Sequence, residues 1–429
     1  MPNISSNLGF MSKSLRHILF FCLLLTWVPK TYAQLDRYVY CADSAQVDPK
    51  QKYELRFTVD ALTFFRDNEY NSKELLKGYT LPGMWLSPTV SYQALHNLRV
   101  EVGAFMLHFW GANRYPNANY SSLETIEAQR TSKAFHCVPI FRANLQLTPQ
   151  ANIVLGTLYG KTAHELCTPL YNDEMNLTSD PETGVQILWH PQWMKFDAWI
   201  DWQDFIFQND HGQERFAFGL STRFLPSRRT ARAKWHLPLQ IVMKHTGGEI
   251  NTEASDRSIK TWLNAAAGAG VDIPLPTRHV PVTLSADLTA TYFSQQSGNV
   301  LPFNKGYGLL AQVGAHLWHF GLSAAWWQSH KFIPIYGSTL FSSMSTSTAA
   351  TTLTNPRAFL FHGEYAQPLA RGFSWGVALD YMLHNEDNII QANPLSWRSG
   401  QTKGNFSAGI YLRLSPSFLI KKFHTAQTR

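Results

Sequence analysis

Hydrophobic and polar residues alternate along this chain in segments of about a dozen residues, which are separated in turn by short and long connections. Residues 194–210, MKFDAWIDWQDFIFQND, show the pattern most clearly. One face of this segment is apolar and the other mostly polar, with Phe196, Ala198, Ile200 and Trp202 set against Lys195, Asp197, Trp199, Asp201 and Gln203. An apolar outside and a polar inside are typical of strands in a transmembrane β-barrel.

About sixteen segments fit this two-residue period, with ends uncertain by about two to four residues. An even number of strands with alternating short and long connections predicts an all-β, antiparallel up-and-down barrel. Short turns and both termini are then expected in the periplasm, and long loops outside. The expected strands span about 52–65, 84–96, 98–110, 134–148, 151–161, 185–191, 194–208, 213–226, 233–246, 261–275, 280–294, 305–318, 320–331, 356–367, 372–386 and 404–414.

A soluble β-sandwich or propeller is the structural alternative, because its strands also alternate. Its strands would usually have only about 5–6 residues, which is shorter than many of the segments here. It would also have to bury Phe216, Phe218, Leu220 and Phe224 from one strand in a core. The pattern therefore favours the membrane barrel.

The N-terminal end resembles a secretory signal peptide. A basic start is followed by the apolar stretch Ile18–Val28, which is shorter than the roughly 20 residues of a spanning helix, and by small residues before Gln34. We therefore expect a cleaved signal at 1–33, with its start at Met1 or Met11. A short periplasmic segment at 34–51, the barrel at 52–414 and a C-terminal periplasmic extension at 415–429 are expected to follow.

The composition agrees with a membrane barrel. Aromatic residues make up 14% of the chain, and Trp alone occurs 14 times, which fits aromatic girdles at the two membrane interfaces. The formal charge of +7 falls by three when the basic residues of the signal are removed. No basic stripe stands out, so we expect no nucleic-acid partner.

Four cysteines occur, and Cys22 lies in the expected signal. The odd remainder of Cys41, Cys137 and Cys167 argues against a disulfide scaffold. A Cys137–Cys167 bridge and three free thiols both remain open.

The layout resembles that of porin-like bacterial outer-membrane barrels, at the level of architecture rather than of any family motif. The resemblance implies an outer-membrane location and contact with its lipids. Alternation then assigns a charged lumen lining in which acids and bases either face water or pair across strands, for example Asp60 with Arg413, or Asp197 or Asp201 with Arg215. The expected lining residues are Arg56, Asp60, Arg99, Glu101, Arg142, Asp197, Trp199, Asp201, Arg215, Arg223, Asp287, Asp380 and Arg413.

Two long loops matter for the lumen. Residues 162–184 form the third long loop, which in porins commonly folds inward and narrows the pore. It either folds in, and brings His164, Glu165, Asp173 and Glu174 to a constriction, or stays outside as a surface loop. Residues 333–355 are rich in Ser and Thr with almost no charge, and we expect a flexible external loop there.

We expect a channel for passive diffusion of small polar solutes, as a monomer or homotrimer. The alternative is a non-conducting barrel that acts as a structural or assembly partner of another envelope protein. A remote alternative is a hydrolase at the rim, with His362 and Glu364 or Asp380 and His384 activating water. Because no nucleophile or metal motif appears, we expect no enzymatic activity, no cofactor and no metal site.

Overall fold

The computed structural model describes residues 35–41, 45–72, 75–76, 78–110, 135–206, 213–228, 230–247, 259–277, 280–346, 351–385, 389–390 and 402–423. The expected signal peptide lies outside these residues. No helix in the described ranges is long and apolar enough to cross a membrane.

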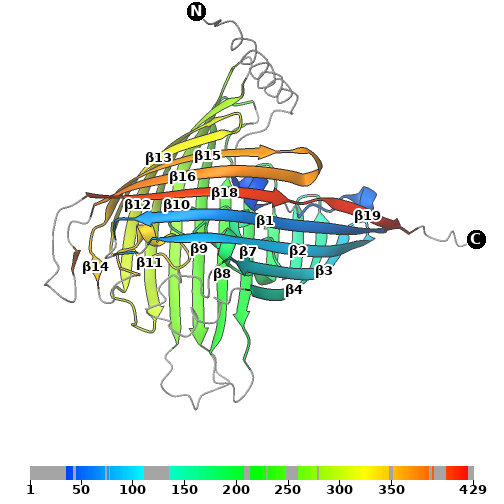
Figure 1. Cartoon of the computed structure of the whole chain (residues 1–429), viewed down its shortest axis with the longest axis horizontal. Helices are drawn as coiled ribbons and strands as arrows, with labels where there is room; N and C mark the ends of the chain where they lie inside the picture. Colours follow the sequence, from blue (N-terminus) through cyan, green and yellow to red (C-terminus); the bar gives the residue numbers. More distant parts are fainter. Residues whose placement is uncertain are drawn as a thin grey trace, which may run out of the picture.

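Long antiparallel strands make up most of the described chain, and each pairs with the next along the sequence (Figure 1). The sheet contains β1 (Glu54–Tyr70), β2 (Tyr79–Leu95), β3 (Leu98–Phe109), β4 (Phe135–Thr148), β5 (Ala151–Thr157), β6 (Thr183–Trp189), β7 (Met194–Asp204), β8 (Glu214–Phe224), β9 (Lys234–Gly247), β10 (Lys260–Leu275), β11 (Val282–Ser297), β12 (Lys305–Leu317), β13 (Phe320–His330), β15 (Arg357–Pro368), β16 (Phe373–Asn385), β18 (Thr402–Leu414) and β19 (Ser417–Lys422). The short strands β14 (Thr352–Leu353) and β17 (Ile389–Ile390) form a separate pair.

The first strand closes the barrel, because β1 pairs with β2 on one side and with both β18 and β19 on the other. Figure 1 shows β1 lying between β18 and β2. Only Ser415 and Pro416 separate β18 from β19, and the amide of Val59 donates to the carbonyl of Pro416 across this interruption at 3.1 Å. The two segments therefore act as one closing strand, and the prediction of a closed barrel of sixteen strands is confirmed. Pairing runs past Leu414, where the sequence had suggested that the barrel ends.

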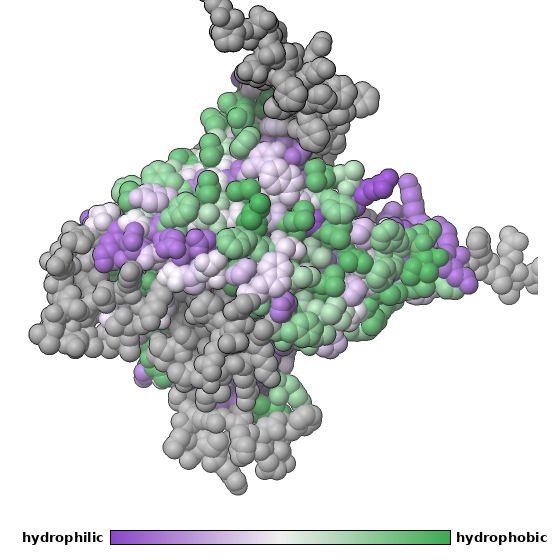
Figure 2. Space-filling view, viewed as in Figure 1, coloured by the Kyte–Doolittle hydropathy of each residue, from purple (hydrophilic) through white to green (hydrophobic). Residues whose placement is uncertain are grey.

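The two faces of each strand differ as the alternation predicted. On β12, Val313 is 59% exposed on the outside, whereas its neighbour Gln312 lines the interior. Large apolar side chains such as Val102 and Phe141 cover the outside of β3 and β4, and Figure 2 shows an apolar surface over this part of the barrel. This belt of apolar side chains is the surface that contacts lipid.

The loop between β5 and β6 folds into the lumen, which decides between the two alternatives for this segment. It contains the short helices η3 (Lys161–His164) and α3 (Met175–Thr178). The indole of Trp85 on β2 donates to the carbonyl of Asn176 at 3.1 Å, and Gln240 on β9 bonds the amide of Cys167 at 2.9 Å. The loop therefore crosses from one wall of the barrel to another.

The loop after β13 also folds inward, so the expectation of a flexible external loop at 333–355 is wrong for its described residues. Ile333 is 1% exposed, and Asn264 on β10 bonds its carbonyl at 3.0 Å. The amide of Asn172 in the first infolded loop donates to the carbonyl of Tyr336 at 2.9 Å, so the two loops are joined. They pack with the inner wall in an apolar cluster that includes Leu170, Trp262, Phe293, Trp327, Phe332, Ile333, Ile335 and Phe341.

A third segment, η1 (Asp36–Tyr40), lies inside the barrel near β15, β16 and β18. Val39 is fully buried, and its carbonyl accepts a hydrogen bond from Arg413 at 2.5 Å. The carbonyl of Ala45 further along accepts bonds from Asn144 and Asn152, each at 2.8 Å. Lumen side chains thus hold the main chain of this N-terminal segment.

We expect the two faces of β12 to respond differently to the same substitution. Val313→Arg places a charge in lipid and should destabilise the barrel by about 2–4 kcal/mol if the position lies near the bilayer midplane. Gln312→Arg, one residue away, places the charge in the lumen and should change stability by less than about 1 kcal/mol. Urea unfolding in lipid vesicles, followed by heat-modifiable gel mobility, measures both. Equal destabilisation by the two variants would contradict the assignment of faces.

Candidate functional site

A cavity of about 1320 Å³ occupies the part of the lumen that the infolded loops leave open. Its lining reaches residues at the short-turn end of the barrel, including Pro149, Gln150 and His190. Towards the long-loop end it is bounded by Leu166 and Phe341 of the two infolded loops. The cavity therefore extends towards the short turns, where residues of the N-terminal segment such as Ala45 also line it.

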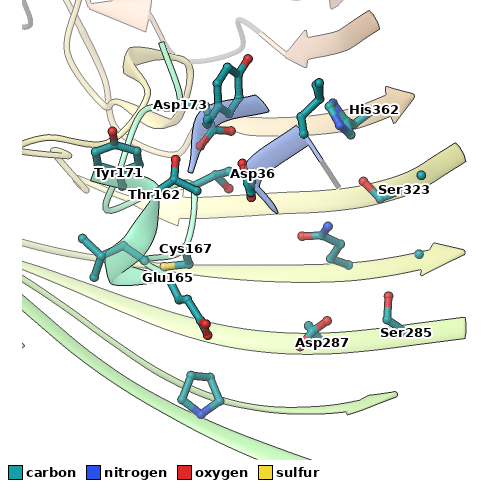
Figure 3. Close-up of a pocket in the computed structure, with 18 of the residues that line it drawn as sticks. Asp36, Thr162, Glu165, Cys167, Tyr171, Asp173, Ser285, Asp287, Ser323 and His362 are labelled. Carbon is teal, nitrogen blue, oxygen red and sulfur yellow. The ribbon is translucent and has the colours of Figure 1, made fainter. Parts of the chain in front are cut away.

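Three residues on consecutive strands of the cavity wall form the most reactive arrangement. In the strand register, Ser323 on β13 lies opposite His362 on β15, and His362 lies opposite Asp380 on β16. The imidazole Nδ1 of His362 is 2.6 Å from Oδ1 of Asp380. Opposed residues on neighbouring strands have Cβ atoms about 4.5–5.5 Å apart, so Ser323 and His362 are within reach of each other. All three residues line the cavity, and Figure 3 shows Ser323 and His362 on neighbouring strands there.

Further side chains hold this group. Arg66 donates to Oδ2 of Asp380 at 3.2 Å and lies 3.5 Å from Glu174 of the infolded loop. The other imidazole nitrogen of His362, Nε2, is 3.5 Å from Glu364. Glu364 in turn accepts a bond from the amide of Leu35 at 3.2 Å, so the N-terminal segment touches the same group.

Two glycines lie beside Ser323 on the inner face. Gly321 and Gly314 lie on the same wall of the cavity, and Gly314 is the partner of Ser323 on β12. A Cβ at Gly321 would lie 2.7 Å from Cγ of Glu364, so only glycine fits beneath this side chain.

A row of apolar side chains runs beside the polar one. Two residues further towards the long loops on the same strands, the register brings together Ala325, Leu360 and Met382. These three residues also line the cavity. Ser323, His362 and Asp380 therefore lie at a boundary between polar and apolar wall.

A second His–carboxylate pair lies on the same wall. Nε2 of His236 on β9 is 2.7 Å from Asp287 on β11, and Nδ1 is 3.7 Å from Asp272. A Cβ at Gly270, which lies between them on β10, would be 2.2 Å from Nε2 of His236. Carboxylates thus face both ring nitrogens, as they also do at His362, but the His236 side chain is 3% exposed against 36% for His362, so His236 is the less accessible of the two to a substrate.

His164 of the infolded loop is part of a buried ion-pair network. Its two ring nitrogens lie 2.8 Å from Asp197 on the wall and 2.8 Å from Glu182 of the loop, and its ring stacks on Trp199 at 3.5 Å. Burial opposes the charged form, but the carboxylates of Glu182 and Asp197 outweigh it and raise the pKa of His164 to about 10. With an exposure of 1%, His164 anchors the loop rather than meeting a solute.

The expected lining residues divide into two groups. Arg223, Asp287 and Asp380 line the cavity, together with Glu165 and Asp173 of the infolded loop. Most of the others are engaged in contacts within the lumen: Arg56 with Glu54, Asp60 with Arg413, Arg99 and Arg142 with Glu101, Asp201 with the amide of Thr183, Arg215 with Asp204, and Glu174 with Asn68. Whether any of them lines a conducting path stays a prediction.

The specific pairings met mixed outcomes. Asp60 and Arg413 form the expected ion pair, with 2.9 Å between Oδ1 and Nε. The pairing of Asp197 with Arg215 is wrong, because the infolded loop supplies His164 to Asp197. Trp199, expected to line the lumen, is 4% exposed because the ring of His164 covers it.

Of the residues considered for a hydrolase, His362 and Asp380 are in contact in the structure. His384 is not part of this group. Among the described residues, Nδ1 of His384 has no hydrogen-bond partner. Ser323 and Arg66 were not identified from the sequence. The inward parity of Ser323 was visible, but its neighbours across the sheet could not be read without the register. Arg66 lay beyond the expected strand at 52–65, whereas β1 continues to Tyr70.

No metal or disulfide chemistry emerges from the described part of the chain. No three or more His, Cys, Asp or Glu side chains there are grouped so as to hold a metal ion. Cys137 and Cys167 are both free thiols, so no disulfide joins them. Burial raises the pKa of the Cys167 thiol to about 12, so it is a poor nucleophile.

The closed barrel and its apolar belt define a porin-like outer-membrane β-barrel protein, as the sequence predicted. The sequence profile of the lipid A 3'-O-deacylase-type family matches residues 47–423, which is most of the chain. The chain therefore belongs to this family. No curated protein sequence matches it significantly.

Solved structures of similar shape are outer-membrane proteins. OpdL of Pseudomonas aeruginosa matches with a TM-score of 0.47 and 10% identity, over 85% of this chain and 99% of that one. OpdK of the same organism gives 0.46 and 9%, over 86% and 100%, and a loop L8 deletion mutant of Vibrio cholerae OmpT gives 0.46 and 8%, over 84% and 98%. With TM-scores below 0.5, these matches carry no further argument.

Family membership corrects one expectation from the sequence. We expected no enzymatic activity, and this is contradicted because the family is one of enzymes, lipid A 3'-O-deacylases. The error arose because the period-2 pattern makes most lumen residues polar for structural reasons, so a catalytic group is not distinguished from the other lining residues.

The pKa of His164 predicts how loop docking depends on pH. The folded-state pKa of about 10 lies above the ordinary value of 6.5, so the stabilisation from this histidine is complete below pH 6.5 and is lost as the pH rises through about 10. We expect protease resistance of the loop at 158–182 to fall across this window. His164→Asn should lower the protease resistance of this loop at pH 6 and remove most of its fall with rising pH. If the resistance of the variant falls with pH as steeply as that of the original protein, groups other than His164 cause the fall.

Proposed function

We propose that this protein is an outer-membrane hydrolase of acyl esters. In this proposal Ser323 is the nucleophile, His362 is the general base, and Asp380 orients the imidazole. One observation carries it: the 2.6 Å contact between His362 and Asp380, with Ser323 opposite His362 on the next strand. A serine, histidine and carboxylate in this order, facing a cavity, are the parts of a serine hydrolase.

The chemistry follows from these roles. The Ser323 hydroxyl attacks the ester carbonyl while His362 takes its proton at Nε2, and the protonated imidazole then gives this proton to the departing alkoxide. Water attacks the resulting acyl-serine, again with His362 accepting the proton, and the carboxylic acid leaves with Ser323 restored. Asp380 fixes the Nδ1–H tautomer and stabilises the imidazolium, and Arg66 holds Asp380 in place. Nε2 of His362 lies 3.5 Å from Glu364 in this structure. The imidazole must therefore rotate until Nε2 faces Ser323 before it can accept the serine proton.

Two further observations support an acyl ester as the bond that is cut. The family is named for removal of the 3'-O-linked acyl chain from lipid A, which is an ester hydrolysis. The apolar row of Ala325, Leu360 and Met382 beside Ser323 suits the hydrocarbon of an acyl group.

Passive diffusion of small polar solutes, the function expected from the sequence, has less support. Conduction needs a continuous water-filled path through the lumen. The infolded loops at 158–182 and 331–346 pack together across the long-loop end, with Ile333 and Phe332 at 1% and 0% exposure. No contact among the described residues specifically favours an assembly partner or a homotrimer.

We expect Ser323→Ala and His362→Ala each to lower kcat/KM for ester hydrolysis by about 100-fold or more, because each removes a group that acts in the transition state. The assay uses purified protein with p-nitrophenyl esters, and with lipid A analysed by mass spectrometry. Heat-modifiable mobility of each variant checks folding.

Ser285→Ala is the matched control, since Ser285 lies on the same wall but opposite Asp272 and Gly314. It should leave activity within about twofold of the original protein, as most substitutions away from the reacting atoms do. Full activity in folded Ser323→Ala protein would rule out Ser323 as the nucleophile. Full activity in both Ser323→Ala and His362→Ala would end the proposal.

A further inference from the structure

The long-loop ends of β12, β13 and β15 carry positive charge without any acid along the same stretch of chain. Residues 288–363 contain no Asp or Glu, although they include the whole of β12 and β13. Their Lys and Arg residues are Lys305, Lys331 and Arg357, which begin β12, follow β13 and begin β15. All three therefore lie at the long-loop end of the barrel.

Two of these cations lie on the outer face of the wall. Lys305 has the same parity on its strand as Tyr307, which is 62% exposed, and Arg357 has the same parity as Phe359, which is 54% exposed. Lys305 and Arg357 are themselves exposed. No acidic side chain in the described part of the chain forms an ion pair with either of them. Both charges are therefore available to a ligand on the outside of the barrel.

Neighbouring aromatic side chains place these cations at the membrane interface. Tyr307 and Phe359 each lie two residues nearer to the middle of the strand, and the ring of Tyr307 is 5.3 Å from the ring of His330 on β13. Tyrosine is enriched at the membrane–water interface of such barrels. Two residues of strand span about 7 Å, so Lys305 and Arg357 reach the level of the lipid headgroups.

The same end of the barrel is acidic at another strand. Asp67 and Glu69 lie near the long-loop end of β1, on the outward face that also carries the 49% exposed Phe65. Carboxylates repel an anionic headgroup, whereas lysine and arginine attract it. The charges at this end therefore direct an anionic lipid to β12, β13 and β15.

The spacing of the two cations indicates the kind of headgroup. In the register, His330 lies opposite Tyr307, and Gln328 lies opposite Arg357. The backbones of Lys305 and Arg357 are therefore about 10 Å apart across the strands and about 14 Å apart along them. Lipid A carries two phosphates, one on each sugar of its disaccharide, whereas phosphatidylglycerol carries one. Two separated cations on long side chains fit the headgroup with two phosphates better.

We propose that Lys305 and Arg357 bind the two phosphates of a lipid A molecule on the outer wall of the barrel, with its acyl chains beside Tyr307 and Phe359. This binding surface goes beyond the proposed hydrolysis and does not depend on it. Ser323 and His362 face the lumen from the other side of the same wall.

Native mass spectrometry of the full chain in detergent, titrated with lipid A, tests this inference. Lys305→Gln and Arg357→Gln should each weaken the binding of lipid A about fivefold, and the double variant about 25-fold, because each cation near an anionic headgroup contributes a similar attraction. All variants also carry Ser323→Ala, and the mass of the bound lipid shows that it is intact. Heat-modifiable mobility checks folding.

Lys421→Gln is the matched control. Lys421 lies on β19 opposite Leu55, so it is an outward-facing cation at the short-turn end. Its removal should leave the affinity for lipid A within about twofold, because charges separated by more than a Debye length are screened.

Two comparison lipids complete the test. Lipid A without its phosphates, and phosphatidylglycerol, should each bind at least about tenfold more weakly than lipid A. Equal affinity for lipid A with and without phosphates, or an unchanged affinity in the folded double variant, would overturn the inference. Equal affinity for phosphatidylglycerol would overturn the assignment to a headgroup with two phosphates. Because only binding is measured, these outcomes are separate from the test of Ser323 as the nucleophile.

Discussion

Backbone amides and carbonyls inside a bilayer find no water to bond, and this constraint shapes the whole molecule. It forces the first strand to pair with the last, even though Pro416 removes one donor from the closing strand. Closure in turn fixes which side chains face lipid and which face the lumen. The polar face of every strand must then find partners inside a narrow space.

The infolded segments supply many of those partners. His164 satisfies Asp197, Glu174 meets Arg66, and the main-chain carbonyls of the N-terminal segment accept from Arg413 and Asn144. Buried charges of this kind are costly without partners, so the loops and the wall depend on one another. The remaining cavity is the part of the lumen that no loop fills, and its polar wall keeps residues that are free to act on a ligand.

The strands and their faces could be predicted because a two-residue period is a local property of the sequence. The pair of Asp60 with Arg413 followed from closure alone. The inward course of the loop at 331–346 could not be read in the same way, since its Ser/Thr composition suggested exposure. Phe332, Ile333 and Phe341 within it were the available sign, because such residues are rarely left in water.

The candidate site shows why register matters more than parity for function. Alternation placed His362 and Asp380 on the inner face, together with a dozen other charged residues of equal standing. Only the pairing of β13 with β15 and of β15 with β16 puts a serine, a histidine and a carboxylate in one row. The register of two paired strands depends in part on the connection between them, and the described residues 331–346 of the connection between β13 and β15 pack inside the lumen. The loop that closes the long-loop end therefore also helps to set the row in which the proposed chemistry occurs.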